Sequence, residues 1–124
     1  MKVGHKITEA EREVMEVLWE HPEQVKTREL LDLMEKRGKN WKRQTLNTLL
    51  FRLEEKGIVH RKRAYVQAAM SKEDLLQVQT QEILNNFYDG KFGNFFAALM
   101  GSSKVTEEDT DRLDALLEEL KNKQ

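Results

Sequence analysis

The order of three amphipathic helical segments and one short basic hairpin constrains the fold more than any other feature of this sequence. Apolar residues recur at helical spacing over residues 9–20, 28–37 and 42–56. Two β-prone runs, 58–60 and 64–66, then flank the basic residues 61–63, which predicts a tight hairpin with a basic turn. Three helices followed by such a hairpin are typical of a winged helix-turn-helix, so the sequence predicts a mainly α fold with a small β-hairpin wing.

Residues typical of helix ends support the boundaries of these three predicted helices. Thr8 and Glu11 have the spacing of a capping box, in which each side chain bonds to the backbone amide of the other. Thr27 is predicted to cap the second helix. Gly57 follows the third helix, at the position after a helix end where glycine is favoured. We therefore expect one compact domain over residues 1–70.

Residues 71–124 contain further helical segments but too few apolar residues for a core of their own. Ser71 predicts a helix ending at Asp89-Gly90, a Phe-rich run follows between Gly93 and Gly101, and Gly101–Lys104 is the most loop-like stretch. Thr106 is predicted to cap the last helix.

We expect this C-terminal region to be a helical dimerisation region that buries its apolar side chains against a second copy of the chain. The expected central anchors are Phe87, Phe92, Phe95, Phe96, Leu99, Leu113, Leu116 and Leu117. The alternative is a helical subdomain that folds back on the N-terminal domain of the same chain.

The net charge of −1 hides an asymmetry between the two halves. Residues 1–70 contain 15 Lys and Arg against 11 Asp and Glu, whereas residues 71–124 contain 6 against 11. Within the first half, residues 36–63 hold 10 basic residues and only 2 acidic ones. Such a local excess of positive charge suits a polyanionic partner.

The third predicted helix presents polar side chains opposite its apolar stripe, as a helix does that enters the major groove of DNA. Amides there bond to adenine, and threonine methyl groups contact thymine. The candidates for reading base edges are Gln44, Thr45, Asn47 and Thr48. The candidates for holding phosphates, including the wing, are Lys42, Arg43, Arg52, His60, Arg61, Lys62 and Arg63. The alternative to DNA binding is that these residues form only a solvent-exposed helix face and a basic turn.

Several classes of function are excluded by what the sequence lacks. It has no cysteine, so a disulfide framework, a thiolate metal site and a cysteine nucleophile are ruled out. His5, His21 and His60 are scattered without metal-ligand spacing, and no nucleophile–base pair or glycine-rich phosphate loop is present. We expect no enzyme activity and no cofactor. No apolar stretch is long enough to span a membrane, which predicts a cytoplasmic protein.

The residues of three segments resemble the penicillinase repressor family of bacterial transcriptional regulators, the BlaI, MecI and CopY type. These are residues 7–11, residues 14–19, and Trp41 followed by residues 45–57. The resemblance extends over almost the whole chain. It implies a dimeric winged-helix repressor on a dyad operator of double-stranded DNA, upstream of β-lactamase, resistance or copper-homeostasis genes. It also implies that the third helix reads the operator.

Two features separate this chain from branches of that family. In the antibiotic-responsive members a membrane sensor protease triggers cleavage at an Asn-Phe bond in the Phe-rich segment, and the matching candidate cleavage site here is Ala98-Leu99. This departure counts against induction by proteolysis. The copper-responsive members use a C-terminal cysteine site, which this chain lacks.

Two other functions remain open from the sequence. A winged helix can serve as a protein-interaction module without any nucleic-acid role. A ligand-sensing repressor would bind a small molecule near the junction of the halves, around Tyr65, Phe87 and Tyr88.

Overall fold

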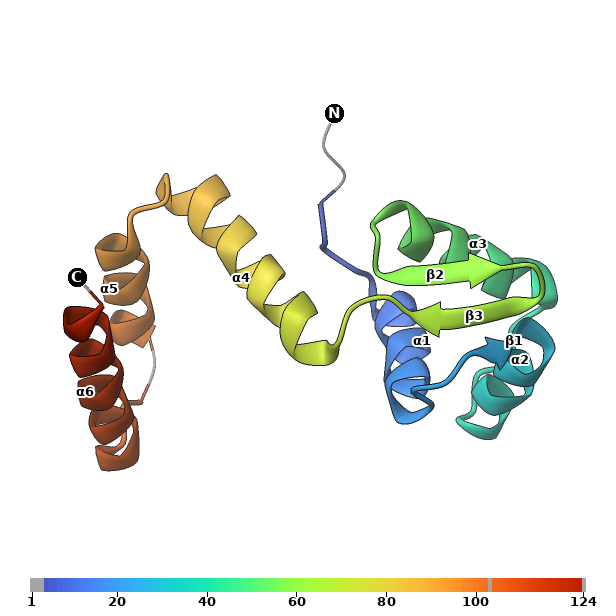
Figure 1. Ribbon diagram of the computed structural model, residues 1–124, viewed down its shortest axis with the longest axis horizontal. Helices are drawn as coiled ribbons and strands as arrows, with labels where there is room; N and C mark the ends of the chain where they lie inside the picture. Colours follow the sequence, from blue (N-terminus) through green and yellow to red (C-terminus); the bar gives the residue numbers. More distant parts are fainter. Residues whose placement is uncertain (1–3, 103, 124) are drawn as a thin grey trace. The chain divides into compact units, whose positions relative to one another are not determined.

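A computed structural model describes residues 4–102 and 104–123, with the side chain of Ser102 left out. The chain divides into two compact units, Met1–Ile83 and Leu84–Gln124. We call them unit 1 and unit 2 and describe each by itself (Figure 1).

Three helices form most of unit 1: α1 (Glu9–Glu20), α2 (Thr27–Lys36) and α3 (Arg43–Glu55). They confirm the three predicted helices. The capping box of α1 is present, since Glu11 N donates to Thr8 Oγ1 over 3.2 Å and Thr8 N donates to Glu11 Oε1 over 3.0 Å. The apolar stripes of the helices meet in one core, whose fully buried side chains include Val14, Met15, Leu18, Leu30, Met34, Leu46, Leu50 and Leu53.

The predicted hairpin is part of a three-stranded antiparallel sheet of β1 (Val25–Lys26), β2 (Val59–Lys62) and β3 (Tyr65–Ala68), in the order β1-β3-β2. Figure 1 shows β2 and β3 as the long arms of the hairpin, with β1 along β3. The β1 strand was not predicted, because two residues are too few to show a strand period. The mainly α winged-helix architecture is confirmed.

Two local predictions in this region were wrong. Thr27 is the first residue of α2 and Lys26 is its N-cap, without a side-chain cap bond. Thr27 donates from both its backbone N and its Oγ1 to Ala64 O, over 2.8 and 3.2 Å, because β1 has brought it beside the hairpin. The turn is shorter than expected: Arg61 and Lys62 belong to β2. Arg63 has a φ of 57°, in the left-handed region that favours glycine.

Helix α4 (Lys72–Tyr88) begins in unit 1 and ends in unit 2. Ser71 caps it as predicted, with its Oγ accepting from Asp74 N over 3.0 Å. Leu75 is the buried residue of α4. The sequence analysis placed the domain boundary at residues 70/71, whereas the two compact units divide inside α4, because the first turns of this helix pack with unit 1.

Unit 2 comprises the end of α4 together with α5 (Phe92–Ser102) and α6 (Glu107–Asn122). The cap of α6 at Thr106 is confirmed, and Asp109 completes a capping box. Gly101 and Ser102 were predicted as loop but continue α5, so the glycine does not end the helix; Ser103 lies outside the described residues.

None of the side chains described in unit 2 is buried. Its apolar residues are therefore exposed or half-buried in the single chain. In the described part of the chain, no helix has the length and apolarity needed to cross a membrane.

Candidate nucleic-acid interface

The outward face of α3 carries the four predicted base-reading residues. Leu46, Leu49, Leu50 and Leu53 face the core, as their spacing predicted. The side chains of Gln44, Thr45, Asn47 and Thr48 are all exposed. Their position on a helix held by four buried leucines gives them a rigid support, which a reading surface needs.

Hydrogen bonding restricts what Thr48 offers to a ligand. Its Oγ1 donates to the carbonyl of Gln44, one turn earlier, over 3.0 Å. The hydroxyl proton is thus engaged within the helix. The remaining lone pairs and the methyl group are the parts of Thr48 suited to an external contact.

Phe51 is an aromatic member of the same face that the sequence analysis did not select. It follows Asn47 and Thr48 by one helical turn, and 54% of its surface is exposed. A large apolar side chain with half its surface in water is unusual on an otherwise polar helix face. The signal was available in the sequence, because position 51 lies opposite the leucine stripe.

A pocket of about 390 Å³ lies beside this face, and we call it the basic pocket. It is lined by Lys26, Thr27, Arg28, Arg43, Asn47, Arg61, Arg63 and Ala64. Five of these residues are cationic and none is acidic, so the pocket suits an anion. Arg43 and Asn47 come from α3, which makes the basic pocket continuous with the candidate reading face.

The basic pocket brings together some of the residues predicted to hold phosphates and adds two cationic residues that were not predicted. Arg43, Arg61 and Arg63 share the basic pocket, whereas Lys42, Arg52, His60 and Lys62 are exposed outside its lining. Lys26 and Arg28 were missed because they precede the hairpin by more than thirty residues in the chain. Only the pairing of β1 with β3 places them beside it.

Arg61 also helps to hold the hairpin against α3 through an ion pair. Its Nη2 lies 3.3 Å from Glu54 Oε1, which joins β2 to α3. Arg43 and Arg63 form no ion pair within residues 4–102 and 104–123. These two guanidinium groups therefore keep all their donors for a ligand.

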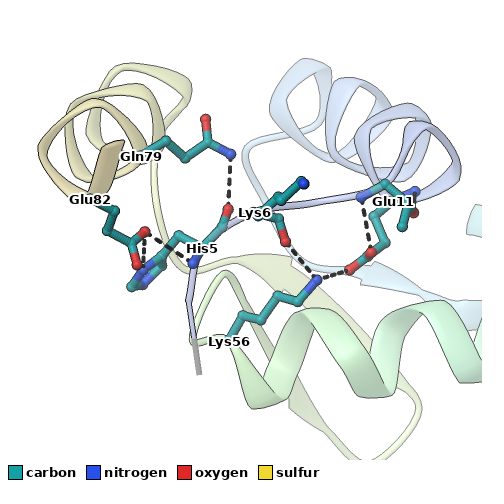
Figure 2. A network of polar contacts seen from close by, with 7 residues as sticks. His5, Lys6, Glu11, Lys56, Gln79 and Glu82 are labelled. Carbon is teal, nitrogen blue, oxygen red and sulfur yellow. Dashed lines mark hydrogen bonds and ion pairs between the residues drawn. The ribbon is translucent and has the colours of Figure 1, made fainter. Parts of the chain in front are cut away.

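The far end of α3 is fixed by a buried ion pair. Lys56 Nζ lies 2.8 Å from Glu11 Oε2, and the two side chains are 17% and 1% exposed (Figure 2). Burial is the largest single influence and raises the pKa of Glu11. The hydrogen bonds from Lys56 and Thr8 and the charge of Lys56 together outweigh it, so the pKa lies below its ordinary value. Glu11 is thus a carboxylate that joins α1 to α3.

The predicted dimer anchors are distributed over unit 2. Phe87 and Phe92 are 77% and 65% exposed. Phe92 stacks on Phe96 with ring centroids 6.2 Å apart, and Phe95 contacts Tyr88 at 5.4 Å. The remaining anchors, Leu99, Leu113, Leu116 and Leu117, come from α5 and α6 and are exposed or half-buried.

Unit 2 contains a pocket of about 300 Å³ between α5 and α6. It is lined by Phe96, Leu99, Met100, Lys104, Val105, Asp109, Arg112 and Leu113. Ala98-Leu99, the candidate cleavage site, lies within α5. Of the residues considered for ligand sensing, Tyr65 belongs to unit 1 and Phe87 and Tyr88 to unit 2.

Comparison with known proteins gives three findings. A family model described as penicillinase repressor matches residues 7–119. The penicillinase repressor of Bacillus licheniformis is 32% identical over 127 residues, covering 99% of this chain and 98% of that protein. An uncharacterised 16.5 kDa protein from the ptsI 3' region of Latilactobacillus sakei is 29% identical over 117 residues, covering 91% and 79%.

Among solved structures, the solution structure of the DNA-binding domain of the repressor BlaI matches with a TM-score of 0.50 and 33% identity. The match covers 60% of this chain and 93% of that domain.

Proposed function

The chain belongs to the penicillinase repressor family, and on that premise we propose that it is a DNA-binding transcriptional repressor that acts as a homodimer on a dyad operator. It is not an enzyme, since the family consists of repressors. The observation that carries the proposal is the basic pocket, which shares Arg43 and Asn47 with the exposed polar face of α3. Phosphate binding and base reading would thereby take place on one continuous surface.

The side chains of the α3 face have the chemistry to read base pairs in the major groove. The amides of Gln44 and Asn47 can bond bidentately to adenine. The methyl groups of Thr45 and Thr48 can contact the methyl group of thymine, and Phe51 can add an apolar contact of the same kind. Such contacts distinguish sequences, whereas contacts with phosphates do not.

The basic pocket would hold one phosphate of the DNA backbone. Arg43 and Arg63 supply guanidinium groups that bind phosphate oxygens in pairs. The N-terminus of α2 adds the backbone N–H groups that follow Thr27, because Lys26 provides no side-chain cap bond and Thr27 N itself already donates to Ala64 O. Lys42, Arg52, His60 and Lys62 would contact phosphates further along the groove. The release of counterions makes such binding depend strongly on salt concentration.

Unit 2 supports the dimer by the apolar surface that it leaves uncovered in a single chain. Phe87 and Phe92 are mostly exposed, and Leu99, Leu116 and Leu117 are at least 40% exposed. Monomeric proteins rarely expose so many large apolar side chains in one small helical unit. A second copy related by a two-fold axis would cover them and would present two reading helices to the two halves of an operator.

The name of one relative supports a proposal for the regulated genes. The Bacillus licheniformis relative is named for repression of penicillinase, so a β-lactamase or another antibiotic-resistance or stress gene is the proposed target. A membrane sensor protease is the corresponding proposed partner. Ala98-Leu99 lies within a helix, so cleavage there would require local unfolding of α5.

The test compares Asn47→Ala with wild type on the DNA upstream of the chain's own gene and on random DNA of equal length. We expect a loss of about 1–3 kcal/mol on the upstream DNA and a much smaller loss on random DNA. Gln77→Ala, at an exposed position of α4, serves as the control and should bind like wild type. Equal losses on both DNAs would remove Asn47 from base reading.

A further inference from the structure

Residues 4–8 form an extended segment that joins three helices of unit 1, and we call it the N-terminal strap. Figure 2 shows it passing between α4 on one side and α1 and α3 on the other. Polar contacts fix the strap at both ends. The contacts of the strap with α4 belong neither to the capping box of α1 nor to the candidate nucleic-acid interface.

The first end of the strap is fixed to the two helices that support the reading face. Lys56 Nζ donates to Lys6 O over 2.8 Å while it also pairs with Glu11. Thr8 N donates to the same carboxylate over 3.0 Å. A single lysine at the C-terminus of α3 thus holds the strap, α1 and α3 together (Figure 2).

The other end of the strap is fixed to α4. His5 N donates to Glu82 Oε1 over 3.0 Å, and His5 Nδ1 lies 3.1 Å from the same oxygen. Gln79 Nε2 donates to His5 O over 2.9 Å. At Gly4 there is little room for a side chain, since a Cβ there would lie 3.3 Å from Glu82 Oε2.

Few apolar side chains of α4 are buried against the rest of unit 1. Leu75 is the buried residue of the helix, whereas Leu76 and Ile83 are 63% and 46% exposed. Beyond the first turn, Gln79 and Glu82 hold α4 to the strap through their hydrogen bonds with His5. They fix the direction in which α4 leaves the winged helix.

We propose that the N-terminal strap, through His5, Gln79 and Glu82, sets the spacing between operator half-sites that the dimer accepts. This inference rests on the proposed repressor function. In it, α4 connects the reading helix of each protomer to the dimerisation region. These three residues are positioning residues, because they act on α4 and not on DNA.

The lever is long enough for a small rotation to matter. From Leu75 to the end of α4 the helix extends for about 20 Å at a rise of about 1.5 Å per residue. A change of about 10° in its direction moves its far end by about 3.4 Å, the rise of one base pair. One base pair also rotates a half-site about the DNA axis by about 35°. A dimer in which α4 is loosely held would bind operators with several half-site spacings, whereas a dimer in which α4 is fixed would bind operators with one spacing.

The experiment selects bound duplexes from a library in which two copies of the footprinted upstream half-site are separated by every spacer length from 0 to about 10 base pairs. Wild type should enrich one spacer length about tenfold over its neighbours. The double variant Gln79→Ala, Glu82→Ala should enrich several neighbouring lengths within about threefold of one another. Its affinity for a duplex with a single half-site should stay equal to that of wild type.

The matched control is the double variant Glu73→Ala, Gln77→Ala, which removes one carboxylate and one amide from exposed positions of the same helix. It should keep the spacing preference of wild type. An unchanged preference in the Gln79→Ala, Glu82→Ala variant would overturn the inference. Equal loss of binding on the single half-site and on every spacer would also overturn it, because the strap would then support only the winged helix. If wild type bound neither the single half-site nor any spacer length, the proposed function itself would fail.

Discussion

Replacing Lys56 with methionine tests the buried connection between α1, α3 and the N-terminal strap. The change keeps the length of the side chain and removes its charge. The carboxylate of Glu11, which is 1% exposed, would then keep the hydrogen bond from Thr8 N but lose its cation. Removing one partner of a buried ion pair costs about 3–5 kcal/mol.

We expect the lower end of this range, about 3 kcal/mol, because Thr8 still donates to the carboxylate. For a domain of this size that lowers the melting temperature by about 10–20 °C. Glu11→Gln should cost less, about 1–2 kcal/mol. Its amide oxygen can still accept from one of the two donors, and the charge that remains, on Lys56, is 17% exposed and therefore better hydrated than the carboxylate of Glu11. Denaturation followed by the fluorescence of Trp19 and Trp41, which pack against the core, measures both free energies.

The effect of Lys56→Met should depend on pH in a defined direction. The pKa of Glu11 is lowered from 4.5 in the folded state, with burial opposing the shift and the bonds from Lys56 and Thr8 causing it. Its contribution to the free energy of unfolding is therefore present above pH 4.5 and is lost as the pH falls through the lower pKa of the folded state. The difference in the free energy of unfolding between wild type and Lys56→Met should narrow on acidification below pH 4.5. A constant difference across this range, or a greater cost of Glu11→Gln than of Lys56→Met, would refute the reasoning.

Three further predictions concern the hairpin, the reading helix and the dimer. Arg63→Gly should lower the slope of log Kd against log salt concentration by about 1. It should not lower the melting temperature, because a left-handed backbone costs a non-glycine residue about 1 kcal/mol. An unchanged slope in anisotropy titrations would remove Arg63 from the interface. Wild type should bind thymine in preference to uracil at one half-site position by about 1 kcal/mol, and Phe51→Ala should abolish this preference. Competition binding in which wild type and Phe51→Ala respond equally to the missing methyl group would contradict this. Leu117→Lys should give a monomer at micromolar concentration in sedimentation velocity, with the exposed Glu118→Lys as control, and a persistent dimer would exclude Leu117 from the interface centre.

The sequence was sufficient for the elements that depend on local patterns. The stripe of Leu46, Leu49, Leu50 and Leu53 predicted both the buried and the polar face of α3. The caps at Thr8 and Thr106 lie three residues from their acidic partners and were therefore visible in the sequence.

Several of the misses depend on contacts between distant parts of the chain. The partners Lys56 and Glu11 are 45 positions apart, and His5 and Glu82 are 77 apart. Lys26 joined the basic pocket only through a strand of two residues. At Gly101 the local signal was misleading, since α5 continues through a glycine that favours a loop.

Quantitative binding of the wild-type chain to its own upstream DNA tests the central claim most directly. The measurement compares that DNA with random DNA of equal length across a salt series, and it determines how many chains bind each site. A repressor of the proposed kind binds two chains per dyad, prefers the upstream site, and weakens steeply as salt increases. Weak binding that is equal on both DNAs and is lost at moderate salt would contradict the account.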